Sequence, residues 1–339
     1  MQMTLDEISI LSVYSAMVVY AIAFIAFAID LARRGAAVTA AADVPARAEA
    51  KVAVGAAAGS KPSGRGRAAA VKVDGEASDG AVAYGRSPAL RVGVAMTVLA
   101  WALHLTATVL RGFAAGRVPW ANMYEFALTG TLIITTVFLV VLLVSKHDLR
   151  FLGTFVTGLV LVLLGVATIN FYVSPIPLPP ALQSVWLVIH VFVASASVGF
   201  FALGFALSVV QLLQSRREAV VASAKAAKLT FLATLPSAAT LENLAYRVNI
   251  IGFIMWTFTL MAGAIWAEKA WGRYWGWDTK EVWTFIIWVV YAGYIHARAT
   301  RGWRGSRSAW LAIIGFSTVL FNFTVVNLFF KGLHAYSGL

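Results

Sequence analysis

Long apolar runs recur along the chain, separated by short polar segments. Each run is close to the length of about 20 residues that an α-helix needs to cross a hydrocarbon layer roughly 30 Å thick. The runs lie at residues 9–31, 88–110, 123–145, 150–170, 185–213, 248–267, 282–300 and 309–329. This pattern predicts an all-α integral membrane protein, a polytopic bundle of about eight transmembrane helices.

Composition and charge support a membrane protein and indicate its orientation. Hydrophobic residues make up 60% of the 339 residues, and the mean hydropathy of +0.80 is too high for a soluble protein. Twenty of the 27 Lys and Arg residues lie in the segments after the first, third, fifth and seventh runs or at the adjoining ends of the runs. The positive-inside rule therefore predicts that both termini lie on the outer face of the membrane, which we expect to be the plasma membrane. The net charge of +12 is explained by topology, not by nucleic-acid binding.

One segment, residues 32–87, differs from the rest of the chain. It is rich in Ala, Gly and charged residues and nearly devoid of large apolar side chains, so it cannot bury enough surface to fold alone. We expect a disordered cytoplasmic linker between a first transmembrane helix, residues 1–31, and a seven-helix domain, residues 88–339. The alternative is a basic arm that touches anionic lipid.

A tryptophan segment, residues 266–283, is the most informative local feature. Six of the twelve tryptophans lie between Trp266 and Trp288. Trp271, Trp275 and Trp277 alternate with glycines, which allow a backbone to approach a flat ligand, and indoles can stack on such a ligand. An aromatic belt at the membrane interface is the alternative, and it accounts better for the tryptophans at or within the spans. The segment indicates a flat aromatic ligand such as haem, held at the outer face.

The histidines add candidate ligands for haem iron. His190 lies near the outer end of the fifth run and His334 just after the last run, both on the face predicted for the tryptophan segment. Two neutral imidazoles are a suitable axial pair for haem iron. His296 lies deep in the seventh run, where an ionisable group is expected to face the bundle interior. The alternative for each histidine is a hydrogen bond to a neighbouring helix, and for His104 this is the favoured interpretation.

Charged residues of the tryptophan segment allow two interpretations each. Asp278 and Glu281 have the spacing of a capping box at the start of the seventh run, and we favour this structural role for Asp278 over direct contact with the ligand. Lys269, Arg273 and Lys280 stand where the carboxylates of a porphyrin would find cations, or they are simply solvated at the headgroup surface. No hydrolase triad or phosphate-binding loop is evident, and the absence of cysteine excludes thiol chemistry by this chain.

Two segments carry a resemblance to a known family. Residues 277–283 (Trp-Asp-Thr-Lys-Glu-Val-Trp), followed by Trp288 and by His296 in Ile-His-Ala-Arg, are similar to the CcsA family of System II cytochrome c biogenesis, called CcsB in some bacteria. Residues 119–126 (Pro-Trp-Ala-Asn-Met-Tyr-Glu-Phe) resemble another segment of that family, with Ala121 in place of Ser. The resemblance runs from about Arg91 to the C-terminus and identifies a WWD-domain haem-handling protein.

The resemblance implies a function and a set of partners. His190 and His334 would bind haem b at the outer site, beside Trp271, Trp275, Trp277 and Asp278. His296 would contribute to a second haem position inside the membrane, completed by a ResB-type membrane partner. The chain would be the subunit of a cytochrome c synthase that presents haem for thioether attachment to the Cys-x-x-Cys-His motif of apocytochrome c. It would act by positioning, with no nucleophilic side chain, and a thioredoxin-like thiol reductase is a further expected partner.

Two other functions remain open at this point. A haem exporter or permease would use the same residues without joining haem to a protein. A membrane scaffold would use the aromatic loop to dock a partner and would bind no cofactor.

Overall fold

All regular structure in the described part of the chain is helical. The computed structural model describes residues 3–55, 87–176, 178, 183–223, 228–300 and 302–334. The long helices are α1 (Leu5–Gly55), α2 (Pro88–Ala115), α3 (Met123–Val144), α4 (Gly153–Asn170), α5 (Val185–Ala222), α6 (Ala238–Trp271), α7 (Thr279–Thr300) and α8 (Ser306–Phe323). Three short elements complete the described part: η1 (Arg150–Leu152), η3 (Thr230–Thr234) and α9 (Val325–Phe329). The predicted all-α architecture is confirmed.

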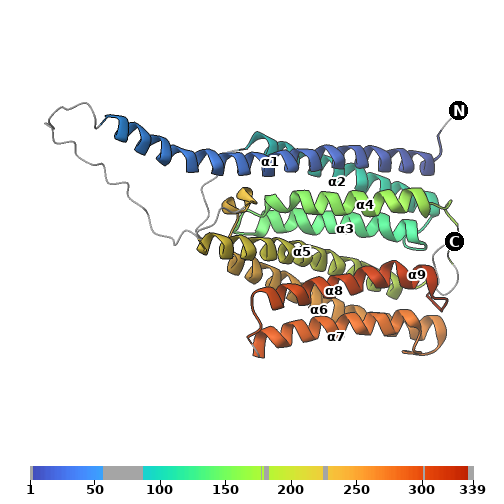
Figure 1. Ribbon diagram of the computed structural model, residues 1–339. Coiled ribbons are helices and arrows are strands. Elements are labelled where there is room, and N and C mark those ends of the chain that lie inside the picture. The colour runs from blue at the N-terminus through green and yellow to red at the C-terminus, as the bar shows by residue number, and fades with distance from the viewer. Residues whose placement is uncertain are drawn as a thin grey trace.

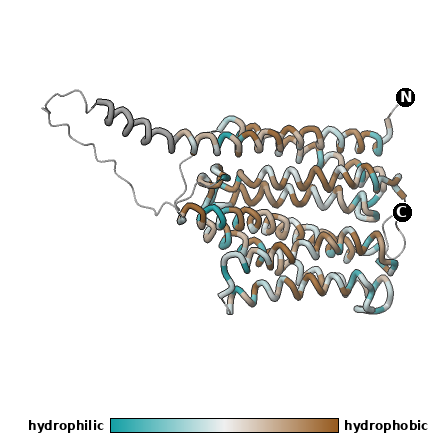
Figure 2. Tube along the Cα trace, viewed as in Figure 1, coloured by the Kyte–Doolittle hydropathy of each residue, from teal (hydrophilic) through white to brown (hydrophobic). Residues whose placement is uncertain are grey.

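The helices form a multi-pass membrane bundle. Seven candidate spans among the described residues are long and apolar enough to cross a membrane. With 22 residues, α7 is as long as α3 but carries more polar side chains. The long helices run side by side (Figure 1), and apolar residues fill much of their length (Figure 2). The prediction of about eight helices is therefore confirmed.

Helix ends are set by local sequence signals. The side chains of Ser87 and Asn122 accept hydrogen bonds from backbone N–H groups in the first turns of α2 and α3, as N-caps do. Gly116 and Gly272 end α2 and α6 in the left-handed region, with φ of 62° and 70°, where glycine has no steric penalty. The last of these caps starts the loop that carries the tryptophan segment.

The first helix is longer than its apolar run. Residues 32–55, expected to belong to the linker, are helical and continue α1; their many alanines favour this conformation. The helix is attached to η3 at the level of Gly35, whose carbonyl accepts a hydrogen bond from Thr230 Oγ1 at 3.2 Å. The rest of the predicted linker, residues 56–86, lies outside the described residues.

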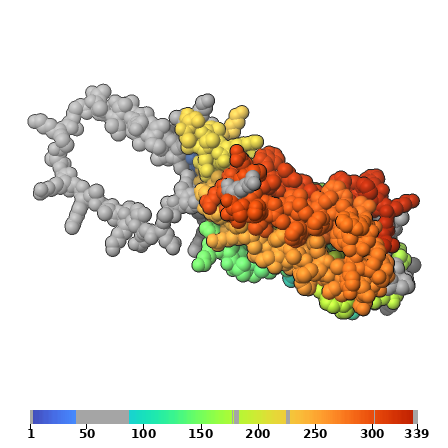
Figure 3. All heavy atoms as spheres, turned by 90° about the horizontal axis from the view of Figure 1, so that it is seen from below, coloured from blue at the N-terminus to red at the C-terminus, as the bar shows by residue number. Residues whose placement is uncertain are grey.

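Helix packing leaves α7 at one edge of the bundle. Phe201 of α5 is buried and stacks on Tyr291 of α7 at 3.7 Å, and α7 and α8 form the outer surface seen in Figure 3. The start of α1 and the end of α9 lie at the same end of the bundle (Figure 1). Which membrane face this end occupies stays a prediction from the charge distribution.

Candidate functional site

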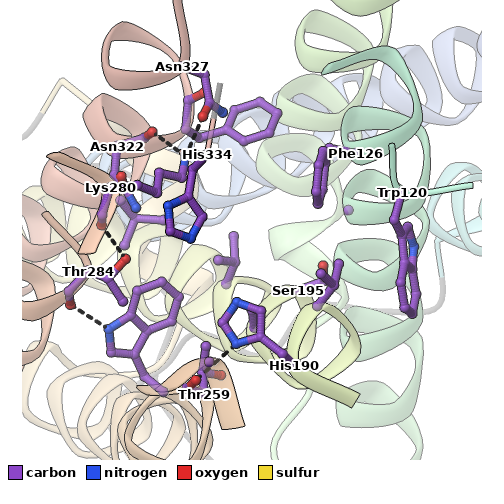
Figure 4. Close-up of a pocket in the computed structure, with 18 of the residues that line it drawn as sticks. Trp120, Phe126, His190, Ser195, Thr259, Lys280, Thr284, Asn322, Asn327 and His334 are labelled. Atoms are coloured by element: carbon purple, nitrogen blue, oxygen red, sulfur yellow. Dashed lines mark hydrogen bonds between the residues drawn. The ribbon is translucent and has the colours of Figure 1, made fainter. Parts of the chain in front are cut away.

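A cavity of about 240 Å3 lies among α3, α5, α6, α7 and α8, close to the loop that carries the tryptophan segment. Its walls are mainly apolar and aromatic, with Trp120, Phe126, Trp256 and Trp266 among the lining side chains. A few polar groups interrupt these walls, and Figure 4 shows His190, His334 and Lys280 among them. An apolar pocket with a few placed polar groups is typical of a small-molecule site.

His190 is held on α5 by a bond that fixes its protonation. Its Nδ1 lies 3.0 Å from the backbone carbonyl oxygen of Thr259 on α6. Because a carbonyl only accepts, Nδ1 carries the hydrogen and Nε2 keeps a lone pair. The imidazole stacks on the ring of Trp266, with 5.9 Å between the ring centroids. A Cβ added at Gly263 would lie only 2.7 Å from Cε1 of His190. Glycine at position 263 thus makes room for the imidazole.

His334 follows α9 and is held by a carboxylate. Its Nδ1 lies 2.8 Å from Asp278 Oδ2, and Asp278 also accepts the backbone N–H of Leu333 at 3.0 Å. The hydrogen bond from His334 is the main reason that the pKa of Asp278 lies below its usual value. The ionised carboxylate accepts from Nδ1–H, so in the neutral form of His334 the lone pair is on Nε2. Histidines that bind metals are commonly oriented by such a carboxylate.

The turn before α7 is organised by Glu281. Its Oε2 accepts the backbone N–H groups of Gly276 at 2.8 Å and Asp278 at 3.0 Å, while Asp278 Oδ2 accepts from the backbone of Lys280 at 3.2 Å. The bond from the Asp278 amide to Glu281 is that of the predicted capping box, whereas the Asp278 side chain accepts from Lys280, one residue before the position of that motif. Trp277, between the two amides bound by Glu281, has a φ of 61°, a conformation that is strained for a bulky residue.

The tryptophans of the segment do not all line the cavity. Trp275 lines the cavity, whereas Trp271 packs edge-on against the ring of His334 at 4.8 Å. Trp277 is 76% exposed and is not among the cavity-lining residues. Trp266 lies within an apolar run, where the sequence favoured an interfacial role. It lines the cavity, and its ring centroid lies 5.9 Å from that of His190 and 5.5 Å from that of His334.

His296 and His104 lie away from the cavity. The expectation that His296 faces the bundle interior is wrong: its side chain is exposed, because α7 packs through Ile287, Tyr291 and Tyr294 on its other side. His104 is buried and its Nε2 lies 2.9 Å from the carbonyl oxygen of Leu128. This geometry agrees with the interpretation of His104 as a residue that links helices.

The three candidate cations, Lys269, Arg273 and Lys280, differ in their partners and in their position relative to the cavity. Lys269 is 61% exposed and pairs with Glu268 at 3.2 Å, and Arg273 pairs with Glu281 at 3.3 Å. Lys280 is the one of these three that lines the cavity. Sequence reasoning did not identify Trp120 as a lining residue, although it lies in the segment 119–126 that carries the family resemblance.

Comparisons with known proteins match this part of the chain. Residues 120–334 match the family model described as cytochrome C assembly protein. The chain belongs to this family. The matched region of this assembly protein begins at Trp120 and ends at His334, two residues that line the cavity.

Individual members of the cytochrome c assembly family give the same result. The cytochrome c biogenesis protein CcsA of Guillardia theta is 35% identical over 268 residues, which cover 73% of this chain and 86% of that protein. CcsA of Microcystis aeruginosa is 33% identical over 286 residues, covering 72% of this chain and 86% of its own. The predicted relation to CcsA is confirmed, and it assigns this chain a role in cytochrome c maturation.

A solved structure shares the fold of this assembly protein. The cytochrome c haem lyase CcmF superposes with a TM-score of 0.61 at 16% identity, and the match covers 95% of this chain. The same match covers 47% of CcmF, so this chain spans about half the length of that structure. At this identity the likeness concerns the fold alone.

Proposed function

We propose that this chain is the haem-handling subunit of a System II cytochrome c synthase. Its family supports a role in cytochrome c maturation, and the cavity supports haem b as the substrate that is held. The observation that carries the proposal is the pair His190 and His334. Both line the same cavity, and each donates Nδ1–H to an acceptor, which in the neutral imidazole leaves a lone pair on Nε2 for a ligand.

The residues present fit a porphyrin-bound iron. His190 and His334 would hold such an iron through Nε2, because neutral imidazoles are suitable ligands for haem iron. The aromatic walls, including Trp120, Trp266 and Trp275, suit the apolar ring and exclude water. Haem supplies vinyl carbons, to which the thiols of a Cys-x-x-Cys-His apocytochrome c add. The chain has no cysteine, so its part is to bind, orient and shield haem at the outer face.

Two proteins complete the proposed assembly besides the apocytochrome. A ResB-type membrane partner would pack against α7, where the exposed His296 could share a second haem position with a histidine of that partner. A thioredoxin-like reductase would keep the thiols of the substrate reduced, because this chain cannot do so.

Visible spectroscopy on the protein purified with its partner tests the haem site. We expect a low-spin, six-coordinate haem spectrum, lost or converted to high spin in His190→Ala and His334→Ala. His296→Ala should keep the spectrum of the outer site, because its side chain lies on the exposed face of α7. Unchanged spectra in both the His190 and His334 variants would exclude them as axial ligands.

The alternative, a haem exporter, differs in its product. Co-expression of this chain, its partner and a Cys-x-x-Cys-His substrate should give covalent holocytochrome, detected by haem staining after denaturation. Haem that crosses the membrane without thioether product would favour the exporter.

A further inference from the structure

We infer that Lys280 forms a subsite of the cavity that binds a carboxylate of the porphyrin. This inference rests on the proposed function, and it identifies which edge of the ligand faces which wall. Haem b carries two carboxylates on one edge of its ring, so a cation in the wall would fix the ring's rotation about the axial direction.

The bonds of Lys280 leave part of its binding capacity for a ligand. Its Nζ donates to the backbone carbonyl oxygen of Asn322 at 2.9 Å and to Asn327 Oδ1 at 2.6 Å. Both acceptors are neutral, and an ammonium group has three N–H donors. One donor is thus available in a cavity-lining position, where burial lowers the pKa of the Lys280 ammonium to about 7.

The carboxylates that flank Lys280 in the sequence are already engaged. Asp278 binds His334, and Glu281 binds Arg273 and two backbone amides. Among the ion pairs of the described residues, none includes Lys280: the negative charge of Asp278 raises its pKa, but the two side chains form no direct pair. A charged group against apolar walls is costly without a counter-charge, so this position favours an anionic group on the ligand.

The location of Lys280 fits a ligand held by the histidines. Figure 4 shows its side chain beside His334, while Trp120 and Phe126 lie across the cavity. A porphyrin bound through His334 would therefore bring one edge toward the ammonium. A hydrogen-bonded pair of ammonium and carboxylate is stronger than a neutral hydrogen bond, and more so where water is excluded.

A ligand-by-variant experiment tests this subsite. The full chain, purified with its partner, is titrated with haem b and with its dimethyl ester, which lacks the charged carboxylates. In the unaltered protein we expect the diacid to bind about tenfold or more tightly than the ester. Lys280→Met should lower the affinity for the diacid by a similar factor and leave that for the ester nearly unchanged. Lys280→Arg should restore the preference, and Lys269→Met, which removes an exposed charge, should not alter it.

Each outcome distinguishes this inference from the proposed function. If Lys280→Met lowers the affinity for both ligands equally, Lys280 only ties α7 to Asn322 and Asn327, and the subsite is overturned. If Lys280→Met still prefers the diacid to the ester as strongly as the unaltered protein does, the subsite is also overturned, because the carboxylates are then bound elsewhere. If neither ligand gives a low-spin spectrum with the unaltered protein, the proposed function itself fails.

Discussion

His190 and His334 are positioned in the same cavity by different means. His190 lies on a long helix and is fixed by a carbonyl of the next helix, with the room that Gly263 provides. His334 lies beyond the last helix and is fixed by Asp278, whose own position is set by the cap of α7. The position of His190 therefore depends on the packing of α5 against α6, and that of His334 on a polar turn.

The packing at Gly263 gives a test at the scale of one residue. Gly263→Ala should displace the His190 imidazole, because the added Cβ would lie 2.7 Å from Cε1. Alanine favours a helix over glycine by about 1 kcal/mol, so affinity for haem should fall without a matching loss of thermal stability. Haem titration and thermal unfolding of the same preparation measure both quantities. Gly293→Ala on α7, where a Cβ meets no atom within 4 Å, is the matched control and should keep full affinity. Equal affinity in the two variants would show that Gly263 does not position His190.

The sequence predicts the two candidate histidines better than the residues that hold them in place. Topology alone places His190 and His334 at one end of the bundle, because each lies near the end of an apolar run. Their partners depend on contacts between distant segments: Asp278 lies 56 residues before His334. The role of Trp266 likewise follows from the register of α6 against α5, and an apolar pattern predicts a buried face but not this register.

At the scale of elements, a buried charge cluster joins three helices beside the cavity. Arg111 of α2 pairs with Asp6 of α1 at 2.8 Å and with Glu125 of α3 at 3.0 Å. Glu125 also pairs with Arg117 at 2.7 Å and accepts the backbone N–H of Ala121 at 2.9 Å. The cluster therefore fixes the loop between α2 and α3, which carries the cavity-lining Trp120.

Removal of one charge from this cluster should destabilise the bundle. Glu125→Gln leaves Arg111, whose side chain is fully buried, without its fully buried carboxylate partner, and breaking a buried pair costs about 3–5 kcal/mol. We expect a clearly lower midpoint of thermal unfolding in detergent. The control is Asp148→Asn, which breaks the exposed pair with Arg150 and should cost about 0–1 kcal/mol. Similar midpoints for the two variants would contradict a supporting role of the cluster.

Apolar runs identify the helices but not their full lengths. The run at residues 248–267 lies inside α6, Ala238–Trp271, and the run at 9–31 lies inside α1, Leu5–Gly55. Hydropathy reports the part of a helix that suits lipid, whereas backbone hydrogen bonds continue into the polar regions on either side. The extension of α6 ends at Trp271, directly before the turn that contains Asp278.

At the scale of the whole molecule, the candidate site lies at the same end of the bundle as the beginning of the first helix and the end of the last one. The start of α1, the end of α9 and the turn between α6 and α7 occupy one end (Figure 1). An even number of crossings requires this arrangement. The cavity therefore lies toward whichever face of the membrane carries these helix ends, and the distribution of Lys and Arg predicts the outer face.

Single cysteines can test this orientation, because the chain contains none of its own. Lys269→Cys introduces a thiol at an exposed position near the end of α6, and Lys146→Cys does the same in the loop between α3 and α4, at the opposite end of the bundle. Both changes remove one exposed lysine, so they alter the charge of the protein equally. A membrane-impermeant maleimide added to intact cells should label Lys269→Cys at once and Lys146→Cys only after permeabilisation. The reverse pattern would place the cavity on the cytoplasmic side, where haem could not be presented to an apocytochrome outside the membrane.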